Sequence, residues 1–97
     1  MEEVLYYNEL YDLYGGLLTD KQKQYFEDYY FHNLSYAEMA SNYSISRNAV
    51  FRQLHITLNK LKEYELILKL HEKQLQLINF AEKLDSDQKK ELLSILS

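Results

Sequence analysis

Apolar residues in the middle of the chain follow the spacing of one buried helix face. The separations are one, four, four and three positions for Ala49, Val50, Leu54, Leu58 and Leu61. These spacings place the five residues on a single stripe of an α-helix. The opposite stripe carries cationic, amide and aromatic side chains: Arg47, Asn48, Phe51, Arg52, His55 and Asn59. The pattern predicts a helix over residues 47–62 with one buried face and one open face.

Helix start signals divide the rest of the chain. Two capping boxes are present, Thr19 with Gln22 and Ser35 with Glu38, in which each side chain bonds the backbone amide of the other residue. Ser46 and Asp85 are further candidates for N-caps. We expect helices over 2–15, 20–32, 36–42 and 47–62, one or two helices over 63–83, and a last helix over 86–96.

Composition extends this pattern to the whole chain. Proline is absent, glycine occurs only at Gly15 and Gly16, and Leu, Glu, Lys and Gln dominate much of the sequence. We predict an all-α fold, with residues 1–97 forming a single domain. The glycine pair lies between the first two helices and predicts a C-terminal cap with positive φ. Asn33 and Asn42 are expected to close the next two helices in the left-handed conformation.

Residues 34–62 have the three features of a helix-turn-helix unit. These are a short first helix with a small residue at the crossing, a tight turn, and a second helix with an apolar inner face. Ala40 supplies the small residue. The side chain of Ile45 is expected to be buried and to anchor the turn to the core. Ser44 occupies the turn position that glycine usually holds, which carries a modest penalty if its φ is positive.

The outer stripe of the second helix has side chains suited to nucleic acid. Arginine can bond guanine through two donors, asparagine can pair with adenine, and phenylalanine can contact the thymine methyl group. A helix N-terminus can hold a phosphate. We expect contacts from Arg47, Asn48, Phe51, Arg52, His55 and Asn59, with Lys60 and Lys62 on the phosphate backbone. The alternative is an ordinary solvated surface that binds nothing.

Charge is distributed unevenly along the chain, whose formal net charge is -4. Residues 1–33 carry a net charge of -5, residues 34–62 a net charge of +3, and residues 63–97 a net charge of -2. An acidic chain can still bind a phosphate backbone through a local basic face. Because this face has few cations, we expect useful affinity to need two copies or a protein partner.

The C-terminal third, residues 63–97, is predicted to be a packing and oligomerisation region. A heptad pattern runs from Val50 to Ile78. One set of seam positions is Val50, Thr57, Tyr64, His71 and Ile78, the other is Leu54, Leu61, Leu68 and Leu75, and together they are the a and d positions. A second stripe contains Ile67, Leu70, Leu77, Ala81 and Leu84. One hypothesis is that one stripe covers the helix-turn-helix core while the other meets a second copy, in a homodimer, or another protein. The other hypothesis is that both stripes are buried inside one bundle.

Several classes of function lack a sequence signal. The chain has no cysteine, and its three histidines lie far apart without neighbouring acidic pairs, so neither a metal nor another cofactor is expected. It has no nucleophile elbow, phosphate-binding glycine loop or candidate acid pair, and we do not expect an enzyme. The acidic N-terminus is unlike a signal peptide, and no long apolar stretch is present. We therefore expect a cytoplasmic protein with no membrane association.

These residues resemble a known family. The segments Leu17–Gln22, Tyr29–Phe31 with Leu34–Ser35, Glu38–Ala40 and Ile45–Phe51 are similar to the YlxM-type family of small bacterial proteins, over about residues 5–75. The helix-turn-helix segment is also similar to the promoter-reading region 4 of sigma factors. The sequence departs from the family pattern at Arg52, His55 and Ile56.

The resemblance implies a function as well as a fold. Genes of this family lie beside those for the signal recognition particle GTPase or its receptor, which implies a regulatory or accessory role in that pathway. One hypothesis is therefore a dimeric protein that contacts nucleic acid, either DNA or the particle's RNA, through its helix-turn-helix. The other is a protein-interaction module that docks a partner such as the particle's GTPase without touching nucleic acid. Salt dependence separates the two.

Overall fold

The described part of the chain, residues 2–96, is helical and without strands in the computed structural model. This confirms the predicted all-α class. In order, the elements are α1 (Glu2–Tyr14), the 3-10 turn η1 (Gly15–Leu17), α2 (Asp20–Tyr30), α3 (Tyr36–Tyr43), α4 (Arg47–Leu68), α5 (Leu70–Ala81) and α6 (Ser86–Leu96).

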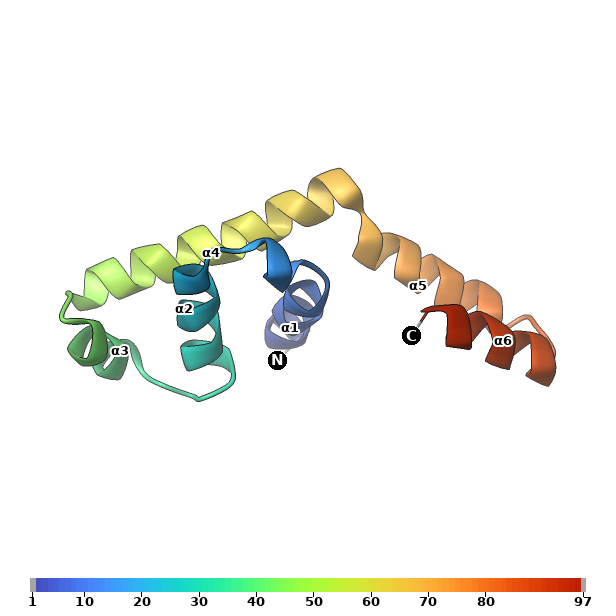
Figure 1. Ribbon diagram of the computed structural model, residues 1–97, viewed down its shortest axis with the longest axis horizontal. Helices are drawn as coiled ribbons and strands as arrows, with labels where there is room; N and C mark the ends of the chain where they lie inside the picture. Colours follow the sequence, from blue (N-terminus) through green and yellow to red (C-terminus); the bar gives the residue numbers. More distant parts are fainter. Residues whose placement is uncertain (1, 97) are drawn as a thin grey trace.

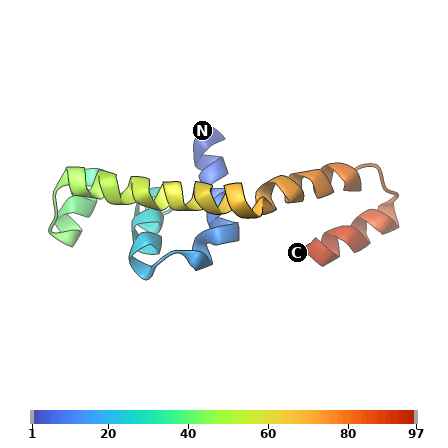
Figure 2. The same ribbon diagram turned by 90° about the horizontal axis from the view of Figure 1, so that it is seen from above.

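The long helix α4 forms the spine of the molecule (Figure 1). Helices α1, α2 and α3 lie along one side of this spine, while α5 and α6 form a separate hairpin beyond its C-terminal end. From above, α5 extends the line of α4, and α1 crosses it (Figure 2). The result is an elongated molecule of 55 × 25 × 22 Å, with the helix-turn-helix at one end and the C-terminal hairpin at the other.

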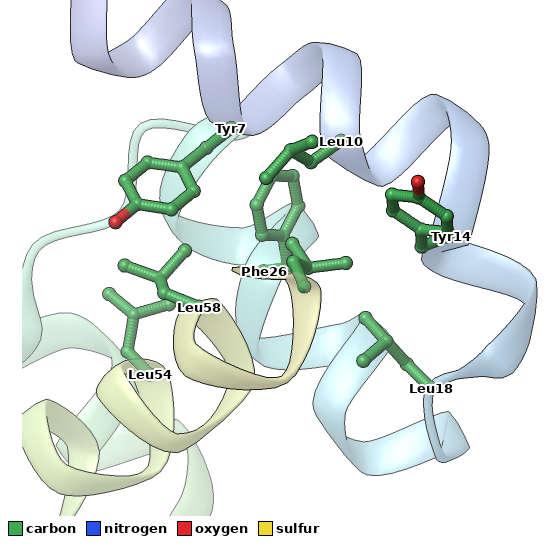
Figure 3. Close-up of a cluster of buried hydrophobic side chains, with 8 residues drawn as sticks. Tyr7, Leu10, Tyr14, Leu18, Phe26, Leu54 and Leu58 are labelled. Carbon is green, nitrogen blue, oxygen red and sulfur yellow. The ribbon is translucent and has the colours of Figure 1, made fainter. Parts of the chain in front are cut away.

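The larger core lies where α1, α2 and α4 meet. Phe26 of α2 is fully buried there, beneath Leu10 of α1 and beside Leu58 of α4 (Figure 3). The cluster also includes Tyr7, Tyr14, Leu18, Leu58 and Leu61. The inner stripe of α4 supplies Leu54, Leu58 and Leu61 to this core, which confirms their predicted burial, whereas Ala49 of the same stripe is only half-buried.

A smaller core holds the helix-turn-helix together. Tyr25 of α2, Met39 and Ala40 of α3, and Val50 of α4 are buried against one another. The small side chain of Ala40 lies where α3 and α4 pack, as expected. Ile45, in contrast, is 36% exposed, so the prediction that it inserts the turn into the core is wrong.

The predicted helix starts are confirmed by their hydrogen bonds. Thr19 and Gln22 form a reciprocal capping box, with distances of 3.0 and 3.1 Å, and Ser35 and Glu38 form a second with 3.1 Å for both bonds. Oγ of Ser46 accepts from the amide of Ala49 at 3.0 Å. Oδ1 of Asp85 accepts from the amide of Gln88 at 2.9 Å. Local sequence therefore fixes where α2, α3, α4 and α6 begin.

The predicted helix ends are only partly confirmed. Asn33 has a φ of 55°, as expected, but the third helix is closed by Ser44 at 56° and not by Asn42. Neither Gly15 nor Gly16 has a positive φ, so the expected left-handed cap at this pair is wrong. Gly15 has a different role, because a Cβ there would lie 3.1 Å from the ring of Tyr11. Close approach of that ring, and not backbone conformation, favours glycine.

A sharp break at Lys69 separates α4 from α5. Lys69 adopts the left-handed conformation, with φ 55° and ψ 31°. Of the one or two helices expected over residues 63–83, the first part is therefore the end of α4 and the rest is the separate helix α5. The break interrupts the heptad pattern. The a and d residues before it, such as Leu54 and Leu61, are buried against α1 and α2 of the same chain. That part of the stripe is consequently not a seam for another copy.

The second apolar stripe remains largely open to solvent. Ile67, Leu70 and Leu77 are all exposed, whereas Ala81 is buried and Leu84 is half-buried. The hypothesis that both stripes are buried inside one bundle is therefore wrong for the described residues.

Candidate nucleic-acid interface

The turn between α3 and α4 sets the direction of the second helix. Ser44 adopts φ 56° and ψ 44°, and the amide of Ile45 reaches back to the carbonyl of Ala40 at 3.0 Å. This is the wrapped hydrogen bond of a Schellman-type helix end. Ser46 then begins α4 as its N-cap. The chain reverses over three residues, and the first turn of α4 lies at one end of the molecule (Figure 1).

Arg47, Asn48 and Arg52 occupy the first turns of α4 with their side chains exposed. Within residues 2–96, neither guanidinium takes part in a hydrogen bond or an ion pair. Both are therefore available to an anionic partner. The positive end of the α4 dipole lies at this same point, which favours a phosphate there.

An aromatic group follows directly along the same stripe. Phe51 is 48% exposed; its ring lies 4.0 Å from that of His55 and 5.9 Å, edge-on, from that of Tyr36, measured between centroids. Nδ1 of His55 donates to the carbonyl oxygen of Phe51 at 3.0 Å, which holds the imidazole against the helix. An apolar platform thus lies between Arg47 and Arg52 along the helix.

The later part of the stripe is exposed and also borders a recess. His55, Asn59 and Lys62 line a recess of about 340 Å³, together with Glu3 and Val4 of α1 and with Tyr7, Tyr29, Tyr30 and Tyr36. The acidic start of α1 therefore lies beside these residues. Because Glu3 brings negative charge to the recess, a phosphate is disfavoured there relative to the start of α4.

The two lysines expected to contact the backbone lie in different settings. Nζ of Lys62 is 5.3 Å from the centroid of the Tyr7 ring, and a hydrogen bond with Tyr7 raises the pKa of Lys62 above its usual value. Nζ of Lys60 lies 3.6 Å from Oε2 of Glu63. At 100° per residue, Lys60 projects from a different side of α4 than Arg52 and Asn59. Arg47, Asn48, Phe51, Arg52 and His55 form one continuous strip, which we call the α4 strip.

Tyr36 was not among the expected site residues, yet it supports the α4 strip. Its ring stacks on Tyr29 at 5.3 Å and meets Phe51 edge-on. The capping box at Ser35 already places Tyr36 at the first position of α3. What sequence could not give is the orientation of α3 on α4, which brings the ring beneath Phe51.

Other kinds of site lack support in the described part of the chain. No group of three or more metal-ligating side chains occurs within residues 2–96. In the same residues, no helix combines the length and the apolar character that crossing a membrane requires.

The buried crossing of α3 and α4, the tight turn between them and the open strip on the second helix define a helix-turn-helix protein. The chain belongs to the UPF0122 family: the model of that family, described as "Putative helix-turn-helix protein, YlxM / p13 like", matches residues 1–95. The family is described by its helix-turn-helix. The resemblance found in the sequence is confirmed.

Relatives of known name cover most of the chain. It is 41% identical over 88 residues to the "Probable UPF0122 protein" of Mycoplasma mycoides, covering 91% of this chain and 78% of the relative. It is 36% identical over 94 residues to the UPF0122 protein YlxM of Bacillus subtilis, covering 94% of this chain and 86% of that protein.

Proposed function

We propose that the protein is a cytoplasmic regulatory or accessory protein that binds nucleic acid through the α4 strip. The observation that carries this proposal is the pair of exposed, unpaired guanidinium groups of Arg47 and Arg52 at the start of a helix-turn-helix second helix. Arginine at this position suits both phosphate and guanine. Phe51 between them adds an apolar contact for a base edge.

Each copy brings few charges, so the proposed binding unit is a pair of copies. Two arginines neutralise about two phosphates, and with a salt slope of about -0.9 per contact one copy is limited to weak, non-specific binding. Asn59 and Lys62 contribute only if the target reaches past the start of α1, and Lys60 lies away from the α4 strip. The target is duplex DNA or the RNA of the signal recognition particle, as the family resemblance implies.

Charge reversal tests this proposal. The variant Arg47→Glu with Arg52→Glu is expected to abolish a mobility shift on both duplex DNA and signal recognition particle RNA. Its helical circular dichroism should not change, because both side chains are exposed and unpaired. Lys60→Glu with Lys83→Glu is the matched control, reversing two charges away from the α4 strip, and should retain binding. If the Arg47 and Arg52 variant bound nucleic acid with the same affinity as the unaltered protein, the α4 strip would not be the binding site.

A second candidate function is a protein-docking module in which the helix-turn-helix serves only as scaffold. The exposed apolar residues of α5, including Leu70 and Leu77, favour it. A partner such as the signal recognition particle GTPase would then bind there, with an affinity that hardly changes with salt, because apolar contacts are not screened.

A further inference from the structure

An apolar groove lies between α1 and the C-terminal hairpin of α5 and α6. Leu13 of α1, Leu70 and Leu77 of α5, and Leu96 of α6 line it, with Lys73 and Gln74 at its edge. Its volume is about 310 Å³. Leu66 and Ile67, in the last turn of α4 just before the break at Lys69, are 76% and 70% exposed. We call the groove and these two residues the C-terminal apolar surface.

The chain exposes more solvent-accessible surface than a compact monomer of the same mass. A compact monomer of 11.7 kDa exposes about 5,900 Å². This chain exposes 6939 Å², which is about 1,000 Å² more than its mass requires. A specific protein interface of standard size buries about 800 Å² on each partner. The excess is therefore enough for one such interface per chain.

The shape places that excess at the C-terminal hairpin. The radius of gyration is 16.9 Å, against about 12.5 Å for a compact domain of this length. Helices α1 to α4 enclose both buried clusters, whereas in α5 and α6 the described side chains are exposed or half-buried apart from Ala81. The buried core of the chain is thus formed by α1 to α4. The hairpin of α5 and α6 has exposed apolar side chains but no buried cluster of its own.

Charge does not prevent a second copy from binding here. Residues 70–96 carry four lysines against five acids, a net charge of -1, with both signs interspersed. The acidic excess of the chain lies in residues 1–33, where the net charge is -5. Two hairpins can therefore approach each other with little repulsion, because the strongly acidic segment is elsewhere.

We propose that the C-terminal apolar surface is the docking site of a second copy of this chain. A two-fold pair uses the same surface on both partners, so the protruding Leu66 and Ile67 and the groove between α1, α5 and α6 are available on each. This inference deepens the proposed function, and the role of the dimer in nucleic-acid binding rests on that function. The pair leaves both α4 strips free at the far ends and doubles the arginines that can bind one target.

Mass in solution tests the proposal with no nucleic acid present. At about 20 µM, light scattering after size exclusion should give twice 11.7 kDa. Ile67→Glu with Leu77→Glu should raise the dimer dissociation constant by at least about 100-fold, because each copy would bury two unpaired carboxylates. Circular dichroism should stay unchanged, since these side chains are 70% and 38% exposed.

The matched control lies on the same helix. Ile56→Glu introduces the same charge at an exposed isoleucine of α4, three turns before Ile67, and should remain a dimer. Arg47→Glu with Arg52→Glu should also remain a dimer, which separates failure of this inference from failure of the proposed function. A monomeric mass for the unaltered protein up to about 100 µM would overturn the inference. So would a dimer that survives the change at Ile67 and Leu77.

Discussion

The hydroxyl of Tyr14 donates a hydrogen bond of 2.6 Å to Oε1 of Glu65, and together these side chains cap a helix that neither belongs to. The Tyr14 hydroxyl accepts from the amide of Leu70 at 3.0 Å. Oε1 of Glu65 accepts from the amide of His71 at 3.0 Å, and Oε2 from that of Glu72 at 3.1 Å. The first three amides of α5 are thus satisfied from α1 and α4, and the break at Lys69 is held in place.

Removing the Tyr14 hydroxyl should loosen the start of α5. Tyr14→Phe keeps the buried ring but leaves the Leu70 amide and one Glu65 oxygen without this partner. We expect a loss of about 1–2 kcal/mol in the free energy of unfolding. Hydrogen exchange should show faster exchange at the amides of residues 70–72. Tyr64→Phe, whose hydroxyl makes only a 3.4 Å contact to the Leu17 carbonyl, is the control and should change little.

The same cap predicts a pH dependence. Burial acts to raise the pKa of Glu65, but hydrogen bonds from Tyr14 and the amides of His71 and Glu72 lower it below its ordinary value of 4.5. A depressed pKa means that the stabilisation is present above about pH 4.5 and is lost as the pH falls through the folded value.

Glu65→Gln should therefore reduce stability near neutral pH and remove part of the acid sensitivity. Melting temperatures of both proteins between about pH 6 and pH 3 measure this difference. The two curves should converge at the acid end. Parallel curves over the whole interval would show that Glu65 is not the group responsible.

The two adjacent glycines should respond to alanine with opposite signs. A Cβ at Gly15 would lie 3.1–3.2 Å from the Tyr11 ring, which is stacked on Phe26 at 4.3 Å and cannot move aside freely. Gly15→Ala should cost about 1 kcal/mol, or roughly 4–8 °C in Tm.

Gly16 has no atom within 4 Å of such a Cβ and no positive φ. Gly16→Ala should therefore stabilise the fold by about 0.4–1 kcal/mol, by restricting the unfolded chain. Thermal melts of the two variants side by side test both signs, and the same sign for both would contradict the packing described at Tyr11.

The turn of the helix-turn-helix should tolerate glycine better than serine. Ser44 holds a left-handed conformation that costs a non-glycine residue about 1 kcal/mol. Ser44→Gly should accordingly raise stability or leave it unchanged. Ser41→Gly, in the regular part of α3, should lower it by about 0.5–1 kcal/mol. Chemical denaturation of the pair gives the comparison, and a loss at Ser44 as large as that at Ser41 would exclude relief of strain.

Local chemistry explains which parts of the fold were predictable. Side chains at Thr19, Ser35 and Ser46 bond amides only three residues away, so a short stretch of sequence contains the whole signal. The start of α5 has no such signal, because its cap comes from Tyr14, 56 residues earlier. Lys69 likewise shows no preference for the left-handed conformation, which tertiary contacts impose on it.

The candidate site divides in the same way. Helical period alone places Arg47, Asn48, Phe51 and Arg52 on an exposed face of α4, where the structure has them. It could not show that Lys62 lies on the Tyr7 ring or that α1 borders His55 and Asn59. These relations depend on where α1 packs, and residues far apart in sequence determine that.

The salt dependence of nucleic-acid binding tests the central claim most directly. Two copies present four arginines from their α4 strips, and if each neutralises one phosphate, log K should fall with log salt at a slope of about -3.6 on duplex DNA. The slope should approach zero, with a large loss of affinity, when Arg47 and Arg52 are both replaced by glutamine. A slope that is near zero for the unaltered protein, or that survives this replacement, would contradict the account.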